Sequence, residues 1–194
     1  LAPPVRSRLD SRTEEFTENR RVMVDRLTEI DGLLDEAEAG GGPESHARLA
    51  KRGKLAVRER IALALDADSP FLEISPLAGF NSDYVIGGGA VLGIGVIAGV
   101  ECVIFANDPT VLGGALTPYV AKKWMRALEI ARDNGIPYVS FVESAGADLR
   151  MNASDNKSGG SVVSSRVDHF AQSGRFFYEM IELSKLGIPS VCVV

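Results

Sequence analysis

The sequence contains few of the residues from which metal sites, disulfide frameworks and basic surfaces are built. Its 194 residues include two histidines, two cysteines and one tryptophan, and its formal net charge is −5. His46 and His169 have no metal-ligand spacing around them, so we predict no metal site. The acidic balance argues against nucleic-acid binding. No apolar run reaches about eighteen residues, so we predict no membrane span.

The sequence does contain enough apolar residues for a packed core. They make up 45% of the chain, which is consistent with one or at most two domains. Cys102 and Cys192 lie in apolar, strand-like runs. We therefore expect both to be buried core thiols in a reducing compartment.

Residues 11–39 are predicted to form one long helix. From Met23 onward the apolar residues recur with four-three spacing, which favours a narrow seam against the body of the same chain or, alternatively, a partner helix. Residues 40–43, Gly-Gly-Gly-Pro, are expected to end this helix and to form a linker. Next comes a locally basic block, residues 50–61, in which a short helix through Leu65 is predicted.

From Gly87 the pattern changes to that of β-strands. Residues 87–97 and 100–106 predict a hairpin with a tight turn at Ala98 and Gly99. The Gly-x-Gly at residues 93–95 is not a Rossmann loop, because no helix follows and no third glycine is in place.

A strand-and-helix unit then occurs twice. Residues 118–134 and 174–186 predict amphipathic helices, and each is followed by Gly-Ile-Pro and a strand. Stacking such units gives an α/β fold with a parallel sheet layered by helices. The polar stretch 152–165 between the units is expected to be a mobile surface loop, either a lid or a tolerated insertion. Because the sequence ends inside an apolar strand, we expect it to be the N-terminal portion of a longer protein.

Small residues follow two of the predicted strands, and here we expect the functional site. Residues 105–114 run from a strand into Gly113 and Gly114, and residues 138–148 run from a strand into Glu-Ser-Ala-Gly-Ala-Asp. Both segments place bare backbone amides where a ligand oxygen could lie.

Four segments in this order resemble the carboxyltransferase (β) subunit of biotin-dependent acyl-CoA carboxylases, most closely the methylcrotonyl-CoA or branched-acyl type. The resemblance covers about residues 50–194. The segments are residues 51–61, residues 105–114, residues 126–137 and residues 143–147.

This resemblance implies a crotonase-like (ClpP/crotonase) fold of stacked ββα units, incomplete here and preceded by a helical segment. Residues 1–43 would be an N-terminal helical extension. Residues 44–194 would be the first part of the acyl-CoA-binding N domain. A biotin carboxylase and biotin carboxyl carrier (α) subunit would be the partner, and the β subunits would form a homo-oligomer, commonly a hexamer. The expected location is the cytoplasm, or the mitochondrial matrix of a eukaryote.

The family's reaction moves a carboxyl group from carboxybiotin, carried by the partner, to a short or branched acyl-CoA through a thioester enolate. By resemblance, the backbone amides of Gly146 and Ala147 are candidate oxyanion donors, and Gly113, Gly114 and Ala145 are candidate substrate contacts. Their alternative role is that of small residues in tight turns. The cations that could contact the phosphates of coenzyme A, unless they merely form a solvated helix face, are Arg52, Lys54 and Arg58.

Three departures from the family's pattern put the substrate in doubt more than the reaction class. They are Leu112, where branched-acyl members often carry Lys; Ala145-Gly146, where Gly-Gly is common; and a longer loop at 152–165. The family's main enolate-stabilising glycine pair would follow Val194, so these residues alone are expected to be inactive. The alternative functions are an acyl-CoA decarboxylase α subunit linked to a sodium pump, and a non-catalytic CoA-binding or assembly fragment.

Overall fold

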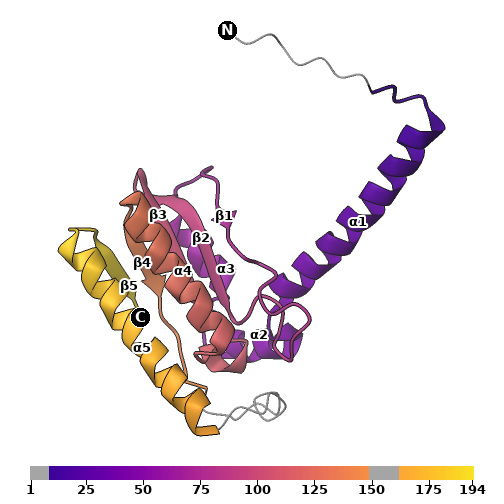
Figure 1. Cartoon of the computed structure of the whole chain (residues 1–194). Coiled ribbons are helices and arrows are strands. Elements are labelled where there is room, and N and C mark those ends of the chain that lie inside the picture. The colour runs from indigo at the N-terminus through magenta and orange to yellow at the C-terminus, as the bar shows by residue number, and fades with distance from the viewer. Residues whose placement is uncertain (1–8, 149–161) are drawn as a thin grey trace.

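The computed structural model describes residues 9–148 and 162–194, with the backbone alone over 162–173 (Figure 1). Three helices lead the chain, a sheet follows, and the last two helices pack against it. The elements are α1 (Glu14–Ala39), α2 (Gly42–Lys51), α3 (Val57–Ala64), β1 (Leu72–Glu73), β2 (Ala90–Ile97), β3 (Val100–Asn107), the 3-10 turn η1 (Leu112–Gly114), α4 (Pro118–Asn134), β4 (Tyr138–Phe141), α5 (Val162–Lys185) and β5 (Ser190–Val193).

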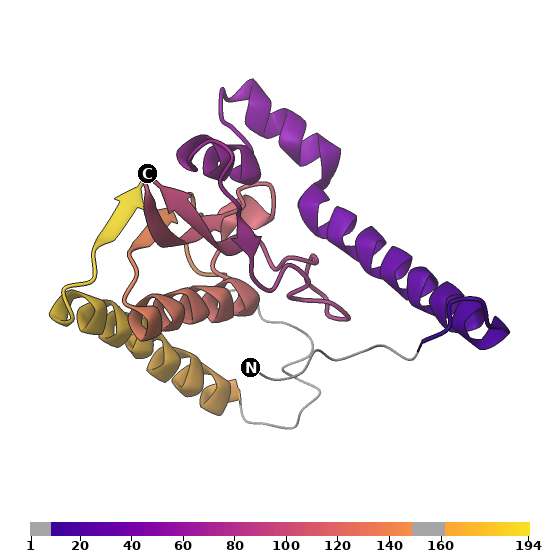
Figure 2. The same ribbon diagram turned by 90° about the horizontal axis from the view of Figure 1, so that it is seen from above.

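The five strands form one mixed sheet in the order β1-β2-β3-β4-β5. The first three strands pair antiparallel, and β3, β4 and β5 pair parallel. Seen from above, the sheet lies between α3 on one side and α4 with α5 on the other (Figure 2). The parallel part of the sheet therefore comes from the two predicted strand-and-helix units.

The predicted hairpin is confirmed. Ile97 pairs with Val100 across a two-residue turn in which Ala98 and Gly99 have φ values of 53° and 77°. Two successive positive φ angles are what a tight hairpin turn of this twist requires. The Asp66 carboxylate fixes the turn by accepting hydrogen bonds of 2.7 Å from each of its two backbone N–H groups.

Helix α4 has the predicted bounds, and local signals explain both ends. The Thr117 hydroxyl accepts a hydrogen bond from the Val120 N–H at 3.2 Å, and Pro118 takes the first helical position. Gly135 ends the helix in the left-handed conformation. The core between α4 and the sheet includes Leu92, Val103, Val120, Leu128 and Ala131, all fully buried.

One charged side chain of α4 is also buried. Lys123 is 3% exposed, and its Nζ donates to the carbonyls of Gly87 and Ala90 at 2.8 and 2.7 Å. Burial lowers the pKa of Lys123 to about 8. This side chain ties α4 to the glycine-rich entry of β2.

Residues 40–43 end α1 as predicted, but the prediction that they form a linker is wrong. Helix α2 begins at Gly42, directly after a turn that packs on the segment following β3. The Gly41 N–H donates to the Thr110 hydroxyl at 3.0 Å, and a Cβ on Gly41 would overlap the Thr110 carbonyl. This junction holds α2 against the segment that follows β3. The domain boundary at residue 43 remains a prediction.

Two other expectations need correction. The short helix predicted in the basic block is present as α3, which ends at Ala64 with Leu65 as its C-cap, but the first two residues of the block belong to α2. Cys102 is buried as predicted, and burial raises the pKa of its thiol, but Cys192 is exposed. It lies on β5, the edge strand, whose residues no other described element covers.

The predicted loop at 152–165 is shorter than expected at its C-terminal end, because residues 162–165 already belong to α5. The remainder, 152–161, lies outside the described residues.

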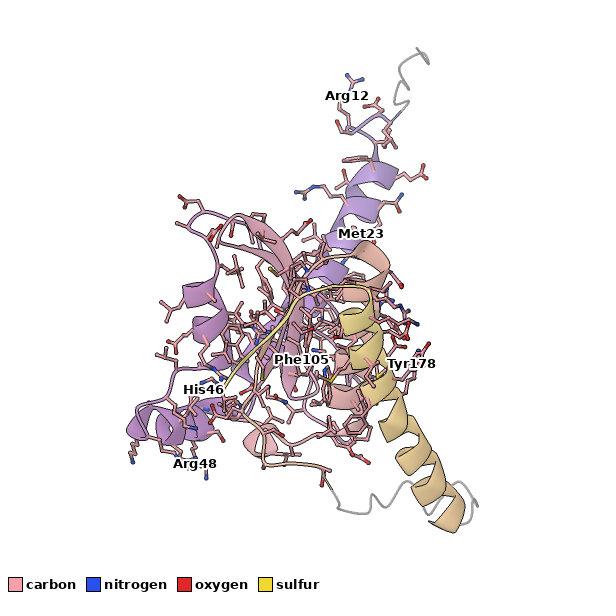
Figure 3. The ribbon with its side chains drawn as sticks, turned by 90° about the vertical axis from the view of Figure 1, so that its left-hand side faces the viewer. Arg12, Met23, His46, Arg48, Phe105 and Tyr178 are labelled. Carbon is pink, nitrogen blue, oxygen red and sulfur yellow. The ribbon has the colours of Figure 1, made fainter. Side chains whose placement is uncertain are left out.

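The predicted long helix is present as α1, but its apolar seam does not pack on the described body. The helix projects away from the sheet, as Figures 1 and 3 show. Met23, Leu27 and Ile30 are 60%, 51% and 43% exposed. Of the helix, only Ala37 at its C-terminal end is buried. Among the described residues no helix is both long and apolar enough to cross a membrane.

Candidate functional site

The turn after β3 has an unusual backbone. Leu112, Gly113 and Gly114 follow one another in the left-handed region, with φ values of 51°, 65° and 72°. Glycine adopts this conformation freely, but leucine is strained there. A Cβ on Gly114 would overlap the Glu143 carbonyl oxygen, so this position also has no space for a side chain.

The segment after β4 lies beside this turn. The Ala145 N–H donates to the Gly113 carbonyl at 3.0 Å. A parallel bridge follows, in which Leu116 N donates to Gly146 O at 2.8 Å and Asp148 N donates to Leu116 O at 3.1 Å. The two strand ends that the sequence singled out are therefore brought together by main-chain hydrogen bonds.

Two of the candidate amides are available to a ligand. The N–H groups of Gly113 and Ala147 find no acceptor within the part of the chain that the structure describes. The other three are occupied. Gly146 N–H donates to the Ser144 hydroxyl at 3.1 Å, Gly114 N–H donates to Val111 O at 2.9 Å, and Ala145 N–H makes the bond to Gly113 O described above. Gly146 has a φ of 93° but open space around its missing Cβ, so its requirement for glycine is conformational.

A cavity of about 740 Å3 opens in front of these strand ends. One part of its wall carries cations from α2 and the following residues, namely Arg48, Arg52 and Lys54. Another part is apolar and includes Leu49, Pro109 and Leu112. The backbone wall is formed by Gly113 and the strand end from Glu143 to Ala145. The volume lies within the usual range for small-molecule sites.

The eight candidate residues do not all reach this cavity. Arg52, Lys54, Gly113 and Ala145 line it. The other three glycine and alanine candidates do not: Gly114 and Gly146 each follow a lining residue directly, and Ala147 lies two residues beyond Ala145. Arg58 lies elsewhere: its Nη2 donates to both carboxylate oxygens of Glu73 at 2.8 and 3.0 Å. We therefore leave Arg58 out of the proposed site.

Sequence reasoning missed three lining residues on α2, Ser45, Arg48 and Leu49. A linker at residues 40–43, as the sequence predicts, would place α2 away from the sheet. A usable signal existed, because Arg48 and Arg52 are four residues apart and so share one helix face. Figure 3 shows Arg48 and His46 on α2, and His46 Nε2 lies 3.2 Å from the Ala39 carbonyl oxygen. No group of three or more metal-ligating side chains occurs among the residues described.

The cavity combines backbone amides at two strand ends with three cations, an arrangement that is chemically suited to an anionic ligand. Residues 48–194 match the carboxyl transferase domain, and the chain belongs to this family. It is 42% identical over 190 residues to a probable biotin-dependent acyl-coenzyme A carboxylase beta2 subunit of Mycobacterium tuberculosis, covering 98% of this chain and 33% of the relative.

Two further relatives support the assignment. A probable mitochondrial methylcrotonoyl-CoA carboxylase beta chain of Drosophila melanogaster is 40% identical over 191 residues, or 97% of this chain and 31% of the relative. The crystal structure of the P. aeruginosa geranyl-CoA carboxylase beta subunit superposes with a TM-score of 0.80 at 36% identity, covering 99% of this chain and 34% of that one. The predicted crotonase-like α/β fold is thus confirmed, and the chain spans about a third of the length of the relatives it matches.

Proposed function

We propose that this chain forms the acyl-CoA-binding part of a biotin-dependent carboxyltransferase. In this proposal the protein moves a carboxyl group from carboxybiotin to a short or branched acyl-CoA. Support comes from membership of the carboxyl transferase domain family and from relatives named as acyl-CoA carboxylase beta subunits. The observation that carries the proposal is the cavity, in which cations, an apolar wall and the two small-residue strand ends meet.

Each part of the cavity suits one part of a coenzyme A thioester. Arg52 and Lys54, together with Arg48, would contact the phosphates, since guanidinium and ammonium groups bind phosphate oxygens by charge-assisted hydrogen bonds. The pantetheine arm would pass along Leu49, Pro109 and Leu112 toward the strand ends. The acyl group would then lie near residues 145–147.

The main chain would stabilise the charge that develops on the thioester oxygen. Ala147 N–H is the better of the two predicted oxyanion donors, because its hydrogen is free among the described residues. Gly146 N–H would first have to leave the Ser144 hydroxyl. A single fixed oxyanion donor in other enzymes contributes about 3 to 4 kcal/mol to transition-state stabilisation, so one well-placed amide would matter.

The biotin of a partner protein would supply the carboxyl group. We assign none of the cavity's described residues to biotin. Partnership with a biotin-carrying α subunit and assembly as a hexamer remain proposals that rest on the resemblance.

Calorimetric titration of the 194-residue chain with coenzyme A tests the binding step. We expect binding, and Arg52→Gln should weaken it about tenfold because a charge-assisted phosphate contact is lost. Pantetheine, which has no phosphate, should not distinguish Arg52→Gln from the wild type. Lys185→Gln is the matched control, since Lys185 is an exposed cation on α5 outside the cavity. Equal losses in both variants, or no binding of coenzyme A, would contradict the proposal.

The transfer itself is tested with the polypeptide that carries this sequence, mixed with a biotinylated partner. It should carboxylate at least one short or branched acyl-CoA from a panel. Failure with every member of the panel would reject a carboxyltransferase.

A further inference from the structure

Glu143 is the only acidic residue among the described residues that line the cavity. Its carboxylate forms an ion pair with Lys54 through Oε1, and its Oε2 lies 3.6 Å from Arg60 Nη1. The side chain of Glu143 is 21% exposed and that of Lys54 is 44% exposed. The Glu143 carboxylate is therefore already paired with Lys54, one of the cations that the proposed function assigns to phosphate.

The carboxylate is the fixed member of this pair. The Glu143 backbone is packed against Gly114, and two residues later the Ala145 N–H is hydrogen-bonded to the turn after β3. Arg60 is fixed too, because its Nη2 donates to the Asn107 carbonyl at 3.0 Å. The buried Asn107 amide in turn donates to Gly114 O at 3.3 Å.

Lys54 is the adjustable member. It lies on the connection between α2 and α3, one residue after Gly53 in a left-handed turn. Its long side chain is the more exposed of the two, and no other acceptor for its Nζ is within hydrogen-bond distance among the described residues. Lys54 can therefore leave Glu143 when a stronger anion enters the cavity, at the cost of one partly exposed ion pair.

We propose that Glu143 is a specificity-determining residue that competes with the ligand's phosphate for Lys54. The idea rests on the proposed function, since it takes a phosphate-bearing thioester or coenzyme A as the ligand. Glu143 lowers the affinity for any anion that reaches Lys54. An anion carrying a single weak charge does not displace it, whereas a phosphorylated ligand that also engages Arg48 and Arg52 does.

If Glu143 competes with the ligand, removing its charge should raise the affinity for coenzyme A. A purely structural role predicts an affinity that is unchanged or lower. Glu143→Gln keeps the size of the side chain and a hydrogen-bond acceptor for Lys54 but removes the competing charge. We expect coenzyme A to bind this variant about two- to fivefold more tightly than the wild type, in proportion to the small value of a partly exposed ion pair. The gain should shrink as salt is raised to about 0.5 M, because screening weakens the contact.

Three further variants isolate the effect in the same calorimetric titration. Glu73→Gln is the matched control: Glu73 is 23% exposed and paired with Arg58 outside the main cavity, and its loss changes the net charge equally. It should leave the affinity unchanged. Lys54→Met should weaken coenzyme A binding, and adding Glu143→Gln to it should restore nothing. Pantetheine should bind the wild type and Glu143→Gln alike.

The outcomes separate this inference from the proposed function. Tighter binding by Glu143→Gln alone, lost in the Lys54→Met background, supports the competition. Coenzyme A binding that is unchanged or weaker in a folded Glu143→Gln overturns it and leaves the proposed function standing. A gain equal to that of Glu73→Gln, or one that persists without Lys54, also overturns it. No binding of coenzyme A by any variant overturns both proposals.

Discussion

The two strand-and-helix units share a sequence pattern but end in different environments. In the first, α4 buries Val120, Ala127, Leu128 and Ala131 completely between the sheet and α5. In the second, α5 buries Leu183 on its inner face, while Phe177 and Ile181 are 70% and 63% exposed. Tyr178 on this outer side is labelled in Figure 3. The same sequence pattern therefore gives a core helix in α4, which other elements cover, and a half-exposed helix in α5, whose outer face no described element covers.

The segments that precede the two helices also differ in how far they are covered. The turn after β3 is enclosed, since Gly114 is buried against Glu143 and its carbonyl accepts from the Asn107 amide. The segment after β4 is open, since Gly146 is exposed and has no atom near its missing Cβ. A rigid turn that supports a more accessible amide segment is a suitable arrangement for binding with the main chain.

The sharpest test of this contrast is to truncate one apolar side chain in each helix to alanine. Leu128→Ala should destabilise the chain by about 2 to 5 kcal/mol, because it leaves a cavity in a fully packed region. Ile181→Ala should change the free energy of unfolding by no more than about 0.5 kcal/mol, since its side chain is mostly exposed. Urea denaturation measures both. Equal costs would show that α5 is covered in solution and would remove the distinction.

Substitutions of Gly114 and Gly146, which lie at the site, should show a smaller difference in stability. Gly146→Ala should cost about 1 kcal/mol, because only the left-handed φ is unfavourable. Gly114→Ala adds a steric overlap with the Glu143 carbonyl, so its cost should exceed that of Gly146→Ala by about 1 to 3 kcal/mol. Thermal unfolding monitored by circular dichroism measures the difference. The reverse ranking would mean that the turn after β3 is not the rigid member.

The sequence was sufficient for the parts of this fold that local signals determine. Helix α4 could be placed to the residue because a capping threonine, an N-terminal proline and a C-terminal glycine mark its ends. The hairpin was equally clear from its turn. What the sequence could not supply were contacts between distant segments. The packing of Gly41 on Thr110 brings α2 and Arg48 to the cavity, and pairing with Glu73 removes Arg58 from it.

The burial of Cys192 and the availability of the Gly146 N–H also depend on contacts that the sequence does not reveal. An apolar run around Cys192 resembles a central strand, and its place at the sheet's edge depends on which strands pair. The small residues at 145–147 indicated backbone donors. However, the bond from Gly146 N–H to the Ser144 hydroxyl depends on side-chain geometry that no spacing rule predicts.

We propose that the main chain at these two strand ends holds a coenzyme A thioester. The most direct measurement is a titration of the 15N-labelled chain with an acyl-CoA, followed by backbone amide NMR shifts. We expect the largest shifts at the free amides of Gly113 and Ala147, with smaller ones near Arg52 and Lys54. Shifts concentrated on the outer face of α5, with Gly113 and Ala147 unmoved at saturation, would contradict it.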